Sequence, residues 1–193
     1  MPARNPILTG ERLYLRPIEV EDGAAIARLN AAETETFMER GRLPTSPLRH
    51  EHWFSEVSKH QPPEFILFAV CLLSDDSLIG TMELSEIDWL NRTAETGAWL
   101  YDARNRGQGY GPEAKYLLLE YAFDHLHLHA LRSWVFELNT RSAAAVQRQG
   151  YRPAGRVKWD DFKNGAWHDA LLFDVLRDEW LAARAEWQAR RGA

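Results

Sequence analysis

The spacing of apolar and polar residues divides the first part of the chain into a strand and two helices. Apolar and polar residues alternate at 13–17, which predicts a first strand. Helical spacing follows at 19–30 and again at 49–59. Residues 31–48 between these helices have no regular pattern and contain prolines, so we expect a connection there.

Three strand candidates then follow one another, separated by short polar turns. They lie at 64–73, 77–87 and 92–101. Strands joined by such short turns pair in an antiparallel manner, because a parallel connection needs a dozen residues or more. An antiparallel meander is therefore predicted for the middle of the chain.

The second half of the chain alternates helices with strands. Strands are predicted at 130–138, 151–159 and 166–176, and helices from Pro112 onwards, at 140–149 and at 177–191. Asn164 and Gly165 lie between the last two strands and are the residue types that a tight hairpin turn requires. These elements, without repeats or linkers, predict one mixed α/β domain over residues 1–193.

The charge balance changes this picture by removing several classes of partner. With 23 Lys and Arg against 28 Asp and Glu, the net charge is −5, so nucleic acid is not expected as a partner. The longest apolar run, 66–73, is too short to cross a membrane, and the polar N-terminus has no signal-peptide core. We therefore expect a cytoplasmic protein, in which the lone Cys71 is a buried strand residue rather than a catalytic thiol.

Candidate chemistry is concentrated in the segment 104–114, Arg-Asn-Arg-Gly-Gln-Gly-Tyr-Gly-Pro-Glu-Ala, between a strand and a helix. Glycines at alternate positions permit positive φ and close approach of a ligand, and the following helix offers free N–H groups and a positive dipole end. The segment lacks the third glycine of a dinucleotide fingerprint, where Pro112 stands, and the Gly-Lys-Ser/Thr of a P-loop. It predicts a phosphate-binding loop of another kind.

This segment resembles the Arg/Gln-x-x-Gly-x-Gly/Ala motif of the GNAT acetyltransferase superfamily, with Arg104, Gly107 and Gly109 at the three defining places. Farther along, Asn139, Ser142 and Gly150-Tyr151 resemble a second signature of that superfamily. The hairpin and tail residues are similar to its RimJ/RimL-like branch: Asn164, Gly165, Trp167, Asp169 and 176–180. The N-terminal residues 10–17 and 79–81 are similar to this branch too, so the resemblance extends over nearly the whole chain.

The resemblance implies a mostly antiparallel twisted sheet of about seven strands, flanked by helices, in which a splayed strand pair binds CoA. Acetyl-CoA would be the co-substrate, without a metal, and the acceptor would be a small-molecule amine or a protein N-terminus. The residues that it places around CoA are Ala98, Trp99, Leu100, Arg104, Arg106, Gly107, Gln108, Gly109, Tyr110, Gly111 and Asn139. Asn139 could equally serve as a helix cap.

The catalytic residues are less clearly marked. Many GNAT members have a tyrosine as the general acid at the position where this chain has Val146. In RimL-like relatives a serine at the position of Ser142 is implied to take the role of this acid. Ser142 could also form only a local hydrogen bond to the backbone. Asp161 and Glu95 are our candidates for the base, with Glu83 as a further carboxylate. Each of these carboxylates is equally consistent with a solvated surface acid.

Two other functions stay open. A catalytically idle CoA-binding sensor would explain Val146, and a nucleotide-binding module of another fold would require a parallel sheet, against which the meander argues. His125, His127 and His129 alternate near a helix end and cannot converge on one metal ion from a helix. We expect most of the numerous aromatic residues to lie in the core or in contacts of a homodimer.

Overall fold

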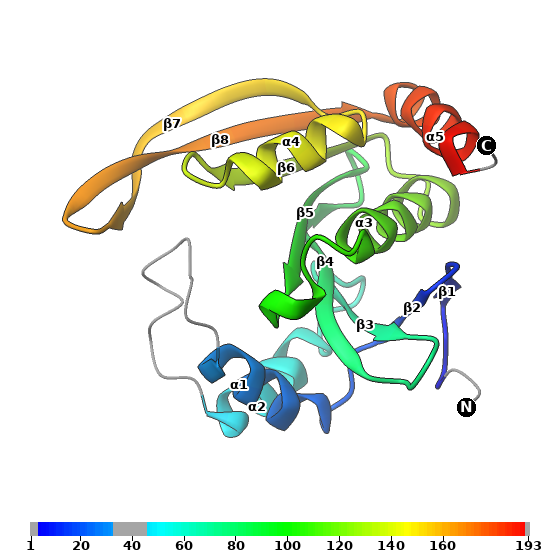
Figure 1. The fold of residues 1–193 in the computed structure, drawn as a ribbon, viewed down its shortest axis with the longest axis vertical. Helices are drawn as coiled ribbons and strands as arrows, with labels where there is room; N and C mark the ends of the chain where they lie inside the picture. The colour runs from blue at the N-terminus through cyan, green and yellow to red at the C-terminus, as the bar shows by residue number, and fades with distance from the viewer. Residues whose placement is uncertain (1–3, 33–45, 192–193) are drawn as a thin grey trace.

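The computed structural model describes residues 4–32 and 46–191 of the chain, and it has a single twisted sheet with helices on both faces (Figure 1). The strands lie in the order β1-β2-β3-β4-β5-β6-β8-β7. Their bounds are β1 Leu8–Thr9, β2 Leu13–Pro17, β3 Ile66–Leu72, β4 Leu78–Asp88, β5 Thr93–Leu100, β6 Ala130–Phe136, β7 Arg152–Lys163 and β8 Ala166–Leu176. The helices are α1 Asp22–Ala32, α2 Pro47–Val57, α3 Tyr110–Glu120, α4 Thr140–Arg148 and α5 Arg177–Arg191.

The pairing within the sheet is antiparallel except between β5 and β6, which are parallel. This parallel pairing covers only Thr93–Glu95 of β5 against Ala130–Arg132 of β6. Beyond it, β5 stays paired with β4 while β6 stays paired with β8. The two central strands therefore separate, and the sheet divides into two halves.

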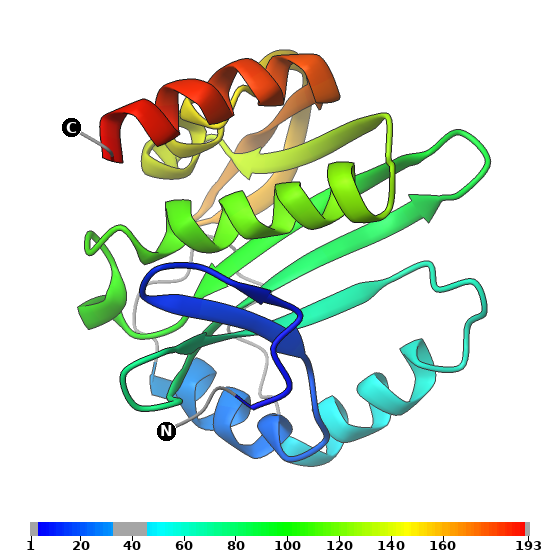
Figure 2. The ribbon, with the colours of Figure 1, turned by 90° about the vertical axis from the view of Figure 1, so that its right-hand side faces the viewer.

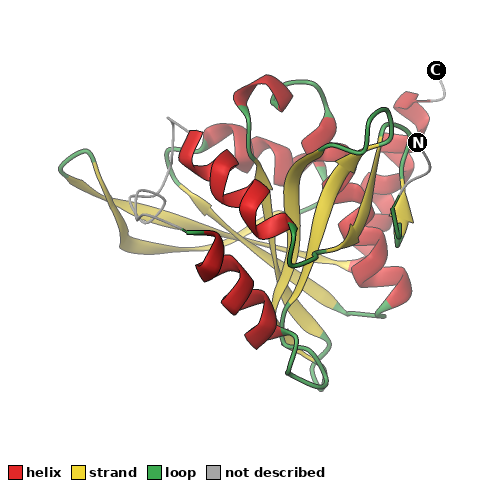
Figure 3. Cartoon of the chain, turned by 90° about the horizontal axis from the view of Figure 1, so that it is seen from below, coloured by secondary structure: helices red, strands yellow, loops and turns green. Residues whose placement is uncertain are grey.

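The core lies mainly on the face of the sheet that α3 covers (Figure 2). Met82 and Leu84 of β4 are fully buried there against Leu118 of α3, and Trp180 of α5 belongs to the same cluster. On the opposite face, Ile26 of α1 and Phe54 of α2 form a smaller cluster. Seen from below, the helices lie on both sides of the strands (Figure 3).

The mixed α/β prediction is confirmed, with differences at the ends of elements. The short β1, which is only two residues long, adds an eighth strand. Helix α3 begins at Tyr110 rather than at Pro112, because Gly109 adopts a φ of 84° and starts the helix earlier. It continues into one π-helical turn, Tyr121–His125. Most of the predicted connection, residues 33–45, lies outside the described residues.

The β7–β8 hairpin is longer than the sequence pattern predicts. A bulge between Val157 and Asp161 lets β7 continue past the predicted end, and Asn164 and Gly165 form the expected turn with positive φ. The hairpin exposes aromatic side chains that we expected in the core or in dimer contacts: Trp159 is 72% exposed and Trp167 is 57% exposed. In Figure 1 the hairpin extends beyond the rest of the sheet.

One buried carboxylate joins the N-terminal turn to the start of α3. Glu113 is 2% exposed, and its Oε1 accepts the backbone N–H of Glu11 at 2.8 Å and of Arg12 at 2.9 Å. Its Oε2 accepts Nε of Arg12 at 3.0 Å. Its negative charge is thus matched by a cation and two backbone donors, which is the condition for keeping a carboxylate inside a protein.

We expect Glu113→Ala to lower the free energy of unfolding by about 2–4 kcal/mol, because it leaves three donors without their acceptor. Urea unfolding followed by circular dichroism measures this loss. Glu120→Ala on the same helix is the control, since within the described part of the chain the Glu120 carboxylate has only a 3.7 Å ion pair with Arg184. Equal losses in the two variants would show that the Glu113 contacts stabilise nothing specific.

Candidate active site

The point where β5 and β6 separate is held by side-chain hydrogen bonds instead of backbone pairing. Thr96 Oγ1 donates to the carbonyl of Arg132 at 2.9 Å, and Ser133 Oγ donates to the carbonyl of Thr96 at 3.2 Å. Because the Thr96 hydroxyl proton is used, the Tyr151 hydroxyl, 2.8 Å away, must donate to Thr96 Oγ1. Three buried hydroxyl side chains, those of Thr96, Ser133 and Tyr151, therefore hold β5 beside β6 at the point where their backbone pairing ends; we call this set of contacts the β5–β6 fastening.

Beyond this fastening, the edge of β5 that faces β6 is no longer paired with it. Ala98, Trp99 and Leu100 keep their pairing with β4 on the other edge. The carbonyl of Leu100 accepts a hydrogen bond from Nε of Arg106 at 3.3 Å and from its Nη2 at 3.2 Å. The strand thus presents backbone groups to the opening, one of which is already bonded to a loop residue.

The glycine-rich loop has the backbone conformation that the sequence predicts. Gly107 and Gly109 have φ of 75° and 84°, a region that disfavours other residues. Gly109 is the N-cap of α3 and has no side chain to cap the helix, so the N–H groups of its first turn stay available to a ligand. Two cations add positive charge here: burial lowers the pKa of Arg106, and the charge of nearby Arg141 lowers it further. The donor set fits a pyrophosphate.

Arg12 braces this loop from the N-terminal turn. Its Nη1 donates to the carbonyl of Gln108 at 2.7 Å, and its guanidinium lies 4.8 Å from the centre of the Tyr110 ring. A side chain at Gly109 would begin only 3.0 Å from Nη2 of Arg12. Arg104, by contrast, is bound to Asp102 and its side chain is 90% exposed.

The predicted residues of α4 lie at its first turn. Asn139 is the N-cap, and its Oδ1 accepts the N–H of Ser142 at 3.1 Å. The cap interpretation of Asn139 is thereby confirmed, while its contact with a cofactor stays a prediction. Ser142 is half-buried, and among the described residues no hydrogen bond to its hydroxyl is found. Val146, at the place of the family's tyrosine, is buried in the core.

Glu83 lies on the face of the sheet toward α1 and α2, because its neighbours Met82 and Leu84 face α3. Its carboxylate lies across Gly97 on β5, and a Cβ at Gly97 would stand 2.4 Å from its Oε1. Burial raises the pKa of Glu83 to about 7; the Lys115 cation opposes the shift and the Glu95 carboxylate adds to it. A carboxyl group that titrates near neutral pH can accept a proton from an amine and release it again.

The other two predicted carboxylates lie in different surroundings. Glu95 accepts the indole N–H of Trp134 at 2.9 Å, on an exposed part of the sheet. Asp161 is opposite His168 in the outer part of the β7–β8 hairpin, beyond the bulge. The geometry therefore groups Glu83 and Glu95 beside the strand opening, whereas Asp161 lies on the hairpin.

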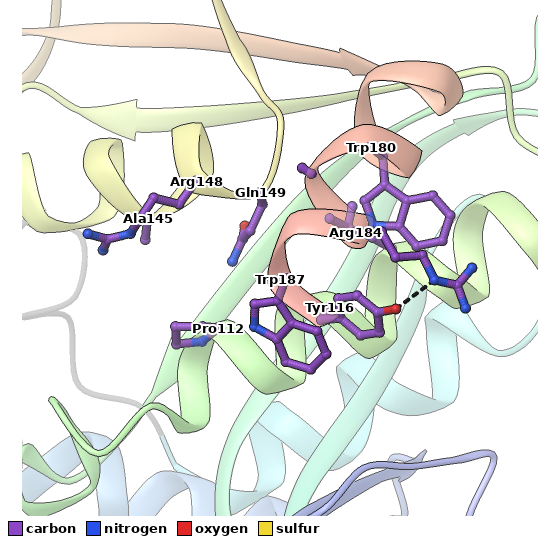
Figure 4. Close-up of a pocket in the computed structure, with 10 residues that line it drawn as sticks. Pro112, Tyr116, Ala145, Arg148, Gln149, Trp180, Arg184 and Trp187 are labelled. Atoms are coloured by element: carbon purple, nitrogen blue, oxygen red, sulfur yellow. Dashed lines mark hydrogen bonds between the residues drawn. The ribbon is translucent and has the colours of Figure 1, made fainter. Parts of the chain in front are cut away.

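A separate pocket of about 220 Å³ lies between α3, α4 and α5 (Figure 4). Its lining includes Pro112, Tyr116 and Trp187, and the Tyr116 and Trp187 rings are stacked 4.1 Å apart. Because α3 and α5 pack on the face opposite to Glu83, this pocket is not where an acceptor would meet that carboxylate.

Two absences complete the description. In residues 4–32 and 46–191, no three His, Cys, Asp or Glu side chains gather as a metal site would require. None of the helices in these same ranges is long and apolar enough to span a bilayer. The three histidines at 125–129 lie along a π-turn and the loop that follows it, and His127 has a positive φ.

Sequence reasoning ranked Glu83 below Asp161 and did not consider Lys115. It included Tyr151 and Arg12 only as parts of the family resemblance, without a role for either side chain. One signal for Glu83 was available in the sequence: it is a carboxylate in a predicted strand next to the strand that contains Gly97. Only the strand register shows that Glu83 and Gly97 lie opposite each other. Lys115 lies in an otherwise apolar helical stretch, where a charged residue is unusual enough to be noticed.

Comparisons with known proteins agree with this geometry. The model of the acetyltransferase (GNAT) domain family matches residues 12–152. The probable N-acetyltransferase YjcK of Bacillus subtilis is 29% identical, with 90% of this chain and 98% of the relative covered. The putative ribosomal N-acetyltransferase YdaF of the same organism is 33% identical, with 88% and 94% covered.

Among solved structures, RimJ of Mycobacterium smegmatis in complex with CoA-disulfide superimposes with a TM-score of 0.77 and is 25% identical, with 93% of this chain and 90% of that chain covered. The family match covers most of the chain, including the loop, the strand opening and the start of α4. The chain therefore belongs to the GNAT family of N-acetyltransferases, which use acetyl-CoA as the acetyl donor.

Proposed function

We propose that this enzyme acetylates a primary amine, either on a small molecule or at a protein N-terminus, with Glu83 as the base. The observation that carries the proposal is the position of Glu83 against Gly97, beside the opening between β5 and β6. An acceptor that approaches from the α1–α2 side would meet this carboxylate. The net charge of −5 favours a cationic acceptor.

The binding part of the proposal assigns acetyl-CoA to the loop and the strand edge. The amides of 106–111 would bind the pyrophosphate, with Arg104 and the side chain of Gln108 at the margin of the loop, and the backbone of 98–100 would bind the pantetheine arm. The positive φ of Gly107 and Gly109 and the uncapped start of α3 support this assignment. Asn139 would hold the start of α4 beside the arm.

The catalytic part of the proposal assigns the proton transfers of the reaction to named side chains. The nitrogen of the neutral amine attacks the thioester carbonyl carbon, the carbon–sulfur bond breaks, and Glu83 takes the proton that this nitrogen loses as the amide forms, directly or through water. Ser142, whose hydroxyl is uncommitted among the described residues, would pass a proton to the departing thiolate in place of the absent tyrosine. Glu95 and Asp161 stay alternative bases.

The setting of the reaction is also part of the proposal. We place the protein in the cytoplasm, where its single buried thiol, Cys71, would stay reduced.

We also propose a homodimer, because Trp159 and Trp167 expose large apolar surfaces on the hairpin. Sedimentation velocity of the wild type and of Trp159→Asp tests the dimer, and a monomer at micromolar concentration overturns it.

Gly109→Val should weaken acetyl-CoA binding by at least about tenfold, because valine disfavours the positive φ that shapes the loop and meets Arg12. Isothermal titration calorimetry measures the dissociation constant. Gly165→Val is the matched control, since Gly165 also has a positive φ, in the hairpin turn. The control should lose stability yet bind normally; an unchanged affinity in Gly109→Val would remove the loop from the binding site.

The base is identified by comparing Glu83→Gln, Glu95→Gln and Asp161→Asn over a pH range. In the wild type, kcat/KM should rise with pH through about 7, since the pKa of Glu83 is raised to about 7 and only its ionised form accepts a proton. Glu83→Gln should lose about 10²-fold in kcat/KM at pH 7 and lose the inflection near pH 7, keeping only the rise that comes from deprotonation of the amine itself at higher pH. The rate of CoA thiol release with a panel of amines is the measurement, and full activity in Glu83→Gln sinks the assignment.

Ser142→Ala should lower kcat by about 10²-fold with a smaller change in CoA affinity, if its hydroxyl protonates the thiolate. Single-turnover kinetics separates the chemical step from binding. Thr140→Ala, two residues earlier in the same helical turn and exposed, controls for a disturbed helix start. A change confined to KM for acetyl-CoA would make Ser142 a binding residue. CoA binding without turnover on any amine would instead favour the catalytically idle alternative.

A further inference from the structure

A lysine is buried in the middle of α3, where the helix packs on the sheet. Lys115 is 4% exposed, and Ala114 and Leu118 on either side of it belong to the core. An ammonium group in such surroundings loses most of its hydration, which destabilises the folded chain unless something nearby compensates. The contacts described above for the loop and for the strand opening assign no role to Lys115.

The side chain of Lys115 ends close to the fastening of β5 and β6. Its Nζ lies 5.6 Å from the centre of the Tyr151 ring, and the hydroxyl of Tyr151 bonds Thr96 at 2.8 Å. The next residue, Gly97, is the one across which the Glu83 carboxylate lies. Lys115 and Glu83 therefore approach the same short stretch of β5, from opposite faces of the sheet.

The two groups act on each other through space. Within the described part of the chain no ion pair or hydrogen bond joins them directly. The charged groups that act on the pKa of Glu83 are the Lys115 ammonium and the Glu95 carboxylate, and Glu83 in turn acts on the pKa of Lys115 and of the Tyr101 phenol. Among these groups, Lys115 is the cation that favours ionised Glu83, whereas Glu95 disfavours it.

We propose that Lys115 is a positioning residue for acetyl transfer, whose ammonium keeps the Glu83 carboxylate ionised and ready to accept the proton of the amine. The inference rests on the proposed role of Glu83 as the base. It makes no use of a contact between Lys115 and either substrate.

The direction of the effect follows from the two titrations. Burial raises the pKa of Glu83 to about 7 and lowers that of Lys115 to about 7, and their mutual attraction opposes both shifts. Removing the lysine charge takes away the attraction that lowers the pKa of Glu83. That pKa must then rise, and less of the carboxylate is ionised at pH 7.

The first test needs no acceptor. In wild type and Lys115→Met, NMR titration of carbon-13-labelled glutamate follows the side-chain carboxyl of Glu83, which Glu83→Gln identifies by its missing signal. We expect the midpoint to rise by about half a unit to one unit in Lys115→Met. Lys59→Met, which makes the same charge change at an exposed position just after the end of α2, should leave the midpoint of Glu83 unmoved. An equal midpoint in wild type and Lys115→Met overturns the inference.

The second test uses turnover. The acid limb of kcat/KM should move to higher pH in Lys115→Met by the same amount, and the variant should approach wild-type activity above about pH 9, where Glu83 is ionised in both proteins. In the Glu83→Gln background the same substitution should have no effect on the pH profile. A loss that is equal at every pH would mean a purely structural role for Lys115.

The outcomes separate the two proposals. If Glu83→Gln keeps full activity, the assignment of the base fails, whatever Lys115 does to the titration. If Glu83→Gln is impaired but Lys115→Met shifts neither the titration nor the acid limb, only the role of Lys115 fails. Methionine matches the length of lysine and suits a buried site, so Lys115→Met should melt at or above the wild-type temperature. Lys115→Leu is the second variant if that protein is poorly folded.

Discussion

The active region depends on one interruption in backbone hydrogen bonding, the end of the β5–β6 ladder after Glu95 and Arg132. Parallel strands that stop pairing leave polar backbone groups on both edges, and those groups need other partners. Here Thr96, Ser133 and Tyr151 supply partners at the point of separation, so the ladder ends at a defined residue. The rest of the site, namely the edge of β5, the loop and the start of α4, is arranged around the gap that results.

Two carboxylates lie beside this region, the buried Glu113 and the partly buried Glu83, and they differ in their partners. Glu113 accepts three hydrogen bonds and has a cation in direct contact, so it acts as a fixed structural link. Glu83 lies across Gly97, and within the residues that the structure describes Lys115, the cation that acts on it, forms no direct ion pair with it. A low-dielectric setting with incomplete compensation leaves a carboxyl group whose protonation can change during a reaction. The same residue type thus lies in two electrostatic settings, which differ in the number of hydrogen-bond and ion-pair partners.

The sequence was informative wherever a short segment determines its own conformation. The loop at 104–114, the turn at Asn164-Gly165 and the cap at Asn139 all follow from local residue types, and each is found in the structure. Alternation also indicates that Glu83 faces away from Met82. It does not give the register that places Glu83 against Gly97, nor the bulge that lengthens β7, because both depend on which strands pair and how far they slide. The sequence also does not show that Lys115 lies near the β5–β6 fastening, because this depends on how α3 packs on the sheet.

The Glu113 link also has a consequence for how the chain folds. Its hydrogen bond to Glu11 connects positions 102 residues apart, so it closes a loop that contains α1, α2 and the whole β3–β5 meander. Contacts of such long range form after local hairpins, since the entropy of the intervening chain must first be overcome. A refolding intermediate can therefore have the meander complete and yet lack an ordered start of α3. The conformation of the glycine-rich loop would then be among the last features that the polypeptide gains, and an N-terminal truncation that removes Glu11 and Arg12 would act on this loop about a hundred residues away.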